Sequence, residues 1–522
     1  MKRIIRIILP AIALLGVISC LKDLDTSPKT EEMLLVEEAW SKEASYEEFL
    51  SKIYAGMALS GNSGTFGVPD LSASDQGEAT FLRSWWYLQE ICTDEVLPTE
   101  DNESMRGLAF CQWNSNNMFI SLNYTRIFLN IAYANEYLRE TTADKMRERG
   151  FGEEFIEKVK GFRAEARALR ALHYYILMDL YANVPFIDED FPVGSADIDQ
   201  RGRDFFFTWI VDEVKACLPL LPEMDPAHYG MFNKTAAKML LAKLYLNAAV
   251  FTGNPMWTEC IEALGDVLDS GAIIDPQYKN MFCADNHRSR EIIFPIIFDG
   301  RHAATFGGTT FLIAASCKSD MNPISSRGFS QAWSNIHATE SLEDVFSAYD
   351  ARAMFWKEGR THDNTVWYDF TNGWSVEKYT NLNADGSPGA NVSFADTDFP
   401  MFRLADAFLM YAEAFLRGGE GADAATALDY VNQLRLRAGI EEIAASDMSL
   451  DFILEERMRE LYWEGHRRQD LIRFGRFTSS YKWPWKNGVY IGISDIPEKY
   501  KIYPLPATEV SINPHITQNE GY

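Results

Sequence analysis

The sequence predicts a mainly α-helical protein in which pairs of helices form a scaffold and a long, loop-rich segment interrupts it. Apolar residues recur at helical spacing through the first half of the chain and again near its C-terminus. Between these regions, residues 271–400 are dense in Gly, Asn, Thr and Trp and contain only short β-like runs such as Ile292-Ile293-Phe294. Hydrophobic residues make up 47% of the 522 residues, which is ample for a large core.

The helices are predicted from runs of apolar residues that would share one face. The run at 153–181 is the strongest, and its alanines would let a second helix approach closely. Asn183-Val184-Pro185 ends it, because the residue before a proline disfavours helix. Consecutive helix pairs favour tetratricopeptide-like packing, although the strict repeat signature is not visible. The predicted helices are 37–57, 79–92, 118–140, 153–181, 204–218, 235–251, 257–269, 402–417, 422–437 and 450–474.

These elements predict the organisation of the chain. Residues 1–19 are expected to be a signal peptide, 20–36 a lipidated tether, and 37–522 a single domain. Within that domain the helical scaffold would occupy about 37–270 and 400–522, and the loop-rich insert about 271–399. Long loops on a rigid scaffold often carry function, so we expect part of the binding site in the insert.

The N-terminus has the pattern of a bacterial lipoprotein signal. A basic start containing Lys2, Arg3 and Arg6 precedes an apolar run at 7–18, and Ser19-Cys20 follows directly. This apolar run is shorter than the ~20 residues that span a bilayer. Cys20 is therefore the predicted lipidation site. The charged residues 21–25 resemble the export signal of lipoproteins displayed on the outer face of the outer membrane, and a solvated tether would have the same composition.

Composition excludes some ligands and leaves others open. The net charge of −26 would repel nucleic acid, so no nucleic-acid partner is predicted. Neutral ligands are unaffected, and sugars suit an exported protein rich in Trp and Tyr. Apart from Cys20, six cysteines remain, and none has zinc-site spacing. Cys92 and Cys111 could form a disulfide, or the thiols could be free and buried.

Four groups of motifs follow one another along the chain: Arg163 to Ala171 with Tyr174-Tyr175 and Asp179 to Pro185, Arg403 to Asp406 with Tyr411 to Ala414, Glu455 to Arg473, and the ending Tyr503 to Pro506 with Asn513 and Asn519. Together these motifs resemble the SusD/RagB family of nutrient-uptake lipoproteins. The family implies a SusD-like fold, a glycan ligand and a separate partner, a SusC-like TonB-dependent outer-membrane transporter. Carboxylates and guanidiniums in these motifs are expected to hold helix to helix, and not to catalyse a reaction.

Two stretches are predicted to bind ligand, because aromatic faces stack on sugar rings while amides, carboxylates and Arg bond their rims. The first contains a Trp pair, of which one member should be core and the other exposed, and an acidic pair that matches the family's "DE" motif. In the second, Trp333 is the strongest choice because polar loop residues surround it. The predicted residues are Arg83, Trp85, Trp86, Asp94 and Asn102 in the first stretch, and Trp333, Asn335, Trp356 and Trp367 in the second.

Other functions have weaker support in the sequence. Asn381, Asn383, Asp385 and Gly386 have calcium-loop spacing, but Val392 replaces the bidentate Glu, so no metal is predicted. No catalytic or cofactor-binding motif is found, and we predict neither enzyme activity nor a cofactor. Two alternatives remain. One is a SusD/RagB-like binder of peptides or another nutrient. The more remote one is a glycoside hydrolase, which needs only two carboxylates across a cleft.

Overall fold

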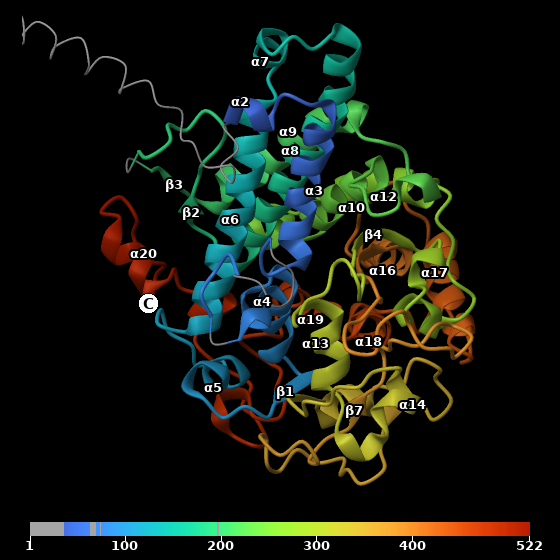
Figure 1. The fold of residues 1–522 in the computed structure, drawn as a ribbon. Helices are drawn as coiled ribbons and strands as arrows, with labels where there is room; N and C mark the ends of the chain where they lie inside the picture. Colours follow the sequence, from blue (N-terminus) through green and yellow to red (C-terminus); the bar gives the residue numbers. More distant parts are fainter. Residues whose placement is uncertain (1–35, 63–68, 74, 196–197) are drawn as a thin grey trace, which may run out of the picture.

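The computed structural model describes residues 36–522 except 63–68, 74 and 196–197. The predicted signal peptide and Cys20 lie outside the described residues. The mainly helical fold with few short strands is confirmed (Figure 1). The first-half helices are α2 Val36–Ala39, α3 Glu43–Ala58, α4 Phe81–Trp86, α5 Glu103–Ala109, α6 Met118–Glu140, α7 Ala143–Glu148, α8 Glu153–Tyr181, α9 Arg203–Cys217, α10 Lys234–Leu246, α11 Ala248–Thr252 and α12 Trp257–Leu268.

The later helices are short in the loop-rich region, whereas α16, α17 and α18 after it are longer. They are α13 Gly308–Ala315, α14 Pro323–Arg327, α15 Glu340–Asp344, α16 Leu404–Leu416, α17 Ala424–Arg437, α18 Leu450–Leu461, α19 Arg467–Arg473 and α20 Ala507–Ile512. In Figure 1 the long helices form one end of the molecule, and the loops around α14 and β7 form the other.

Helix pairing follows the chain. α8 packs against both α6 and α9, and α10 packs against α12. α12 then packs against α16, which also contacts α17 and α18, so the C-terminal helices continue the first-half array. Ala164, Ala166, Ala168 and Ala171 of α8 are all buried, as expected for a helix with close neighbours.

The strands form four two-stranded antiparallel ladders. β1 Val96–Pro98 pairs with β5 Ile336–Ala338, and β4 Ile292–Ile296 pairs with β8 Phe399–Arg403. β2 Val184–Pro185 pairs with β3 Gln200–Arg201, and β6 Phe355–Trp356 with β7 Ser375–Val376. The β1–β5 and β4–β8 ladders join strands more than 100 residues apart in sequence, and so tie the loop-rich region to the helices.

The predicted helix at 450–474 is wrong in one respect, because the chain breaks between α18 and α19. Trp463 has φ 63° and Gly465 has φ 80°, which are left-handed conformations that cannot continue an α-helix. In the described part of the chain, no helix combines the length and apolar character needed to cross a bilayer.

A buried ion network joins the family motifs. The Arg403 guanidinium binds Glu291 Oε1 at 2.9 Å, Glu460 Oε1 at 2.7 Å and Glu464 Oε2 at 2.6 Å. Burial alone would raise the pKa of Glu460, but Arg437, Arg403 and Arg352 hold that pKa far below its usual range. These charges connect α18, β8 and the loop before β4, so their role is structural.

Candidate functional site

The first predicted stretch lies in the core. Arg83 is 4% exposed, Trp85 5% and Trp86 0%, so the expectation that one tryptophan faces solvent is wrong. The reason is that α4 is enclosed by α3, α6 and α13. Trp86 Nε1 donates to the Trp463 carbonyl at 3.0 Å. Neither ring can stack on a ligand at the surface without unpacking this region.

The predicted acidic pair is also buried, and it clamps distant parts of the chain together. Asp94 binds Arg467 through both carboxylate oxygens and accepts a third hydrogen bond from the Tyr481 hydroxyl at 2.7 Å. Glu95 Oε2 accepts from the Trp463 backbone at 3.0 Å. The prediction that Asp94 shapes an open binding face is therefore wrong, because the motif holds the α18–α19 break in place.

The other predicted residues have different environments. Asn102 caps α5 by accepting from the Met105 backbone N–H at 2.8 Å. Trp367 is 5% exposed and packs edge-on against Phe110, so its predicted role as an exposed platform is wrong. Trp356 is half-buried against a small cluster that includes Met321 and Phe370, and its Nε1 donates to the Glu358 carbonyl at 3.2 Å. Ligand contact by Asn102 and Trp356 stays a prediction.

Trp333 lies where the sequence prediction needs an accessible aromatic ring. It is half-buried, and its backbone N–H donates to the Ala314 carbonyl at the end of α13 at 2.7 Å. Its ring is 6.4 Å from that of half-buried Phe306, which in turn is 5.2 Å from the Phe394 ring. We call Phe306, Trp333 and Phe394 the aromatic platform. Phe394 was not predicted, because only the fold brings it beside the other two rings.

Hydrogen-bonding groups surround the aromatic platform. Gln331 accepts from Trp333 Nε1 at 3.0 Å and donates to the Ser393 carbonyl at 2.6 Å, which fixes the indole plane. The Ser330 hydroxyl is exposed and lies 3.3 Å from that of Ser393. Asn335 is half-buried two residues beyond Trp333, and its carbonyl accepts from the Thr99 backbone at 2.7 Å. Rings edged by amides and hydroxyls are suited to a ligand with both apolar and polar faces.

A carboxylate lies near the same place. The Asp75 side chain is 44% exposed, and its Oδ2 binds buried Arg83 at 2.9 Å. The neighbouring Gly77 packs so tightly on Phe306 that a Cβ atom would lie 2.6 Å from the Phe306 carbonyl oxygen. Arg83 thus acts indirectly, by orienting Asp75 from below the surface.

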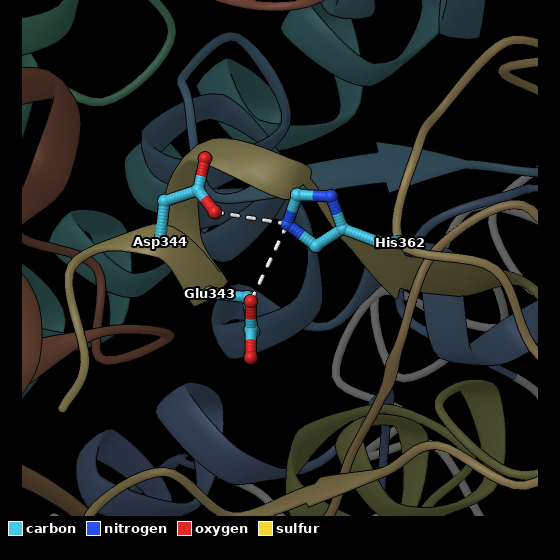
Figure 2. A group of neighbouring side chains, drawn as sticks. All are labelled: Glu343, Asp344 and His362. Carbon is cyan, nitrogen blue, oxygen red and sulfur yellow. Dashed lines mark hydrogen bonds and ion pairs between the residues drawn. The ribbon is translucent and has the colours of Figure 1, made fainter. Parts of the chain in front are cut away.

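A separate group of possible metal ligands lies on the surface of the loop-rich region. His362 Nε2 is 2.9 Å from Asp344 Oδ1 and 3.3 Å from Glu343 Oε2 (Figure 2). Figure 2 shows that both carboxylates come from the end of α15 and face the imidazole on an opposite loop. Lys357 already neutralises Glu343 from the other side. The group is explained as an exposed ion-pair cluster, and we assign no metal to it.

The loop with calcium-like spacing forms a tight turn. The Asn383 backbone N–H donates to the Ser387 carbonyl at 2.7 Å, and Gly386 has φ 87°. Asn381 is buried and donates to the carbonyls of Gly328 and Asn391, so its amide is engaged in structure.

Comparison with known proteins agrees with this fold. Residues 301–522 match the model of the SusD family, and residues 24–246 match one described as "Starch-binding associating with outer membrane". The chain is 30% identical to the starch-binding protein SusD of Bacteroides thetaiotaomicron over 100% of this chain and 99% of that protein. The chain belongs to the SusD family, as the motifs predicted.

Solved structures show the same fold at lower identity. A SusD superfamily protein from Parabacteroides distasonis has a TM-score of 0.71 and 19% identity, covering 92% of this chain and 99% of that one. Surface glycan-binding protein A from Bacteroides thetaiotaomicron, solved with laminarihexaose, has a TM-score of 0.69 and 18% identity, covering 91% of this chain and 99% of that one.

Proposed function

We propose that this protein binds oligo- or polysaccharide at the cell surface and delivers it to a separate SusC-like TonB-dependent outer-membrane transporter. The observation that carries the binding proposal is the aromatic platform, in which Phe306 lies between the Trp333 ring and the buried Phe394 ring, with amide, hydroxyl and carboxylate groups nearby. The relatives add support, since one is named for starch binding and another was solved with laminarihexaose.

The physical argument concerns the two faces of a sugar ring. Its C–H face stacks on an aromatic ring, which contributes about 1–2 kcal/mol per ring by analogy with other aromatic contacts. Its hydroxyls need partners, and Gln331, Ser330 and Asp75 offer them beside the rings. The net charge of −26 does not oppose a neutral ligand.

Calorimetric titration with maltohexaose, laminarihexaose and a wider polysaccharide panel tests the proposal. The wild type should bind at least one glycan, and Trp333→Ala should weaken that binding roughly 5- to 30-fold, the equivalent of losing one stacked ring. Trp257→Ala is the matched control, because Trp257 is a half-buried tryptophan at the start of α12, remote in sequence from the platform. Its affinity should equal that of the wild type.

Two outcomes would contradict the proposal. If the wild type binds no glycan but binds members of a peptide panel, the protein is a peptide-binding relative. If pure protein releases reducing ends from a bound glycan, it is a hydrolase. We assign no catalytic role. Glu90 and Glu95 form a neighbouring acidic pair, and both are buried.

We further propose that the protein is held in the outer membrane by acyl chains on Cys20, with the domain facing outward. Two acyl signals give stable anchoring where one gives only marginal binding. Cys20→Ala should abolish labelling with radioactive palmitate and move the protein from the membrane pellet to the soluble fraction. Protease added to intact cells should digest the wild type, and protection from it would contradict surface display. When the protein is purified from membranes in a mild detergent, the transporter should be purified with it.

A further inference from the structure

A cavity that includes none of the aromatic-platform residues lies beside helices α3 and α8. It has a volume of about 510 Å³ and lies between α3, α8, the loop at 229–231 and β4 with the residues that follow it. Most of its lining is apolar, including Leu50, Met57, Phe162, Phe294 and Ile297. Ile297 is 43% exposed, so the apolar lining continues to the surface. A cavity of this size and lining is typical of a small-molecule site.

One buried carboxylate lines this cavity. Glu165 on α8 is only 2% exposed. Its Oε2 accepts from the Tyr54 hydroxyl, whose oxygen is itself engaged by the Phe232 backbone N–H at 2.8 Å. Among the residues that the structure describes, Glu165 Oε1 has no hydrogen-bonding partner. A buried carboxylate with a free oxygen is costly unless a donor or cation reaches it.

The charged groups near Glu165 do not supply that cation. In the described lining the only basic side chain is Lys158, which is 55% exposed and binds Glu47 at 2.6 Å. The other titratable groups facing Glu165 are the hydroxyls of Tyr54 on α3 and Tyr137 on α6, with Tyr229 further along the lining. Burial raises the pKa of all three hydroxyls, so they stay neutral and none of them supplies a positive charge to Glu165.

We propose that this cavity binds a small amine with an apolar body, whose ammonium group donates to Glu165 Oε1. The apolar lining would leave sugar hydroxyls without partners, which separates this site from the aromatic platform. The net charge of −26 also raises the local concentration of cations. Glu165 Oε1 would accept a hydrogen bond from the ammonium group, and the apolar lining would pack against the apolar part of the ligand.

Protonation of Glu165 gives the site a pH dependence. Burial raises the pKa of Glu165 to about 7. The carboxyl is therefore increasingly protonated below that pH, and an ammonium ligand must displace the proton. Amine binding should strengthen from pH about 6 to pH about 8, whereas binding of a neutral ligand should not.

A matched pair of probes tests the proposal on the full chain. 1-Naphthylmethylamine and 1-naphthylmethanol share one apolar body and differ only in the head group. In calorimetric titration at pH about 8, the amine should bind roughly tenfold more tightly than the alcohol, as for a charge-assisted hydrogen bond. Glu165→Gln keeps the shape of the side chain and removes its charge. The affinity for the amine should therefore fall about tenfold, and the affinity for the alcohol should change less than about twofold.

Control variants locate the binding. Glu157→Gln makes the same chemical change on the same helix, at an exposed residue paired with Lys160, and should leave both affinities unchanged. Ala55→Phe places a ring in the cavity from α3 and should reduce the binding of both probes. A thermal transition measured for each variant checks folding. If Glu165→Gln does not fold, the pH profile and Ala55→Phe decide the question.

Several results would overturn the proposal. Binding of neither probe would show that the cavity is not an amine site. Equal affinity for amine and alcohol, or an amine preference that survives in Glu165→Gln, would remove Glu165 from recognition. Unchanged binding in Ala55→Phe would place the probe elsewhere.

Discussion

The Asp94 carboxylate and the Arg467 guanidinium form a two-point ion pair, with Nε–Oδ1 and Nη2–Oδ2 both 2.7 Å, between residues 373 positions apart in sequence. Both residues are buried. Arg467 also donates to the Leu454 carbonyl, so the pair fixes α18 and α19 relative to the turn before β1. Such a pair holds the two parts of the helical scaffold in one arrangement.

Asp94→Asn should strongly destabilise the fold, because it leaves the Arg467 charge buried without its counterion. The expected loss is about 3–5 kcal/mol in the free energy of unfolding. Urea denaturation followed by circular dichroism measures it. Asp144→Asn is the control, since Asp144 is 92% exposed in its pair with Arg147 and should cost less than about 1 kcal/mol. Equal losses of unfolding free energy in the two variants would contradict the structural role of the Asp94–Arg467 ion pair.

Stability should depend on pH through Glu95. Burial raises the pKa of Glu95 to about 7, and the pKa of its buried neighbour Glu90 is raised as well. The folded state therefore retains a proton that the unfolded chain releases near pH 4.5. The stability that this proton gives is complete below pH about 4.5 and is lost as the pH rises to about 7.

Glu95→Gln removes that titration. The unfolding free energy of the wild type, minus that of the variant, should fall by up to about 1.4 kcal/mol per pH unit over this window. Urea midpoints at several pH values measure the difference. Exposed Glu103→Gln should track the wild type at every pH. A difference that stays flat or grows with pH would be inconsistent with this account.

Trp86 and Trp333 should separate stability from binding. Trp86→Phe loses the hydrogen bond to the Trp463 carbonyl and part of a packed ring, so it should cost about 1–3 kcal/mol of stability. Below its unfolding transition it should bind glycan as the wild type does. Trp333→Ala should show the reverse, with weaker glycan binding and a smaller loss of stability. Weaker glycan binding by Trp86→Phe would instead show that the stretch around Trp86 takes part in binding.

The cysteines should react only after unfolding. The six described cysteines are free and buried, so the open choice between a Cys92–Cys111 disulfide and free thiols is decided for the thiols. Burial raises the pKa of Cys92 to about 11, which suppresses its thiolate. A chromogenic disulfide reagent should detect none of these six thiols in native protein and all six in urea. Fast labelling without denaturant would contradict their burial.

The helix predictions were most accurate where apolar residues keep helical spacing over a long run. The run predicted at 118–140 is Met118–Glu140 in the structure, and the run at 153–181 is Glu153–Tyr181. The break in 450–474 was missed because Trp463 has an ordinary helix-compatible neighbourhood and only Gly465 marks it. Likewise 402–403 were predicted as helix, but they belong to β8, because pairing with β4 outweighs local preference.

The candidate site was harder to predict than the fold. Trp85 and Trp86 lie in a polar-flanked sequence, and their burial depends on Phe399 and Trp463, more than 300 residues later. Trp333 was chosen from its polar neighbours, whereas Phe394 could be placed beside Phe306 only by the fold. The division into a scaffold and an insert at 271–399 stays a prediction.

Hydrogen bonds between the end of α8 and the C-terminal residues affect the order in which the protein can fold. The Tyr503 backbone N–H donates to the Leu180 carbonyl, and the Asn519 amide donates to the Tyr181 carbonyl, both at 2.7 Å. A nascent chain emerges N-terminus first. Asp94 and the end of α8 must therefore wait for residues 467–519 before they find their partners. During synthesis the early helices would lack these contacts, and a ribosome stalled before residue 467 would release a product that never forms them.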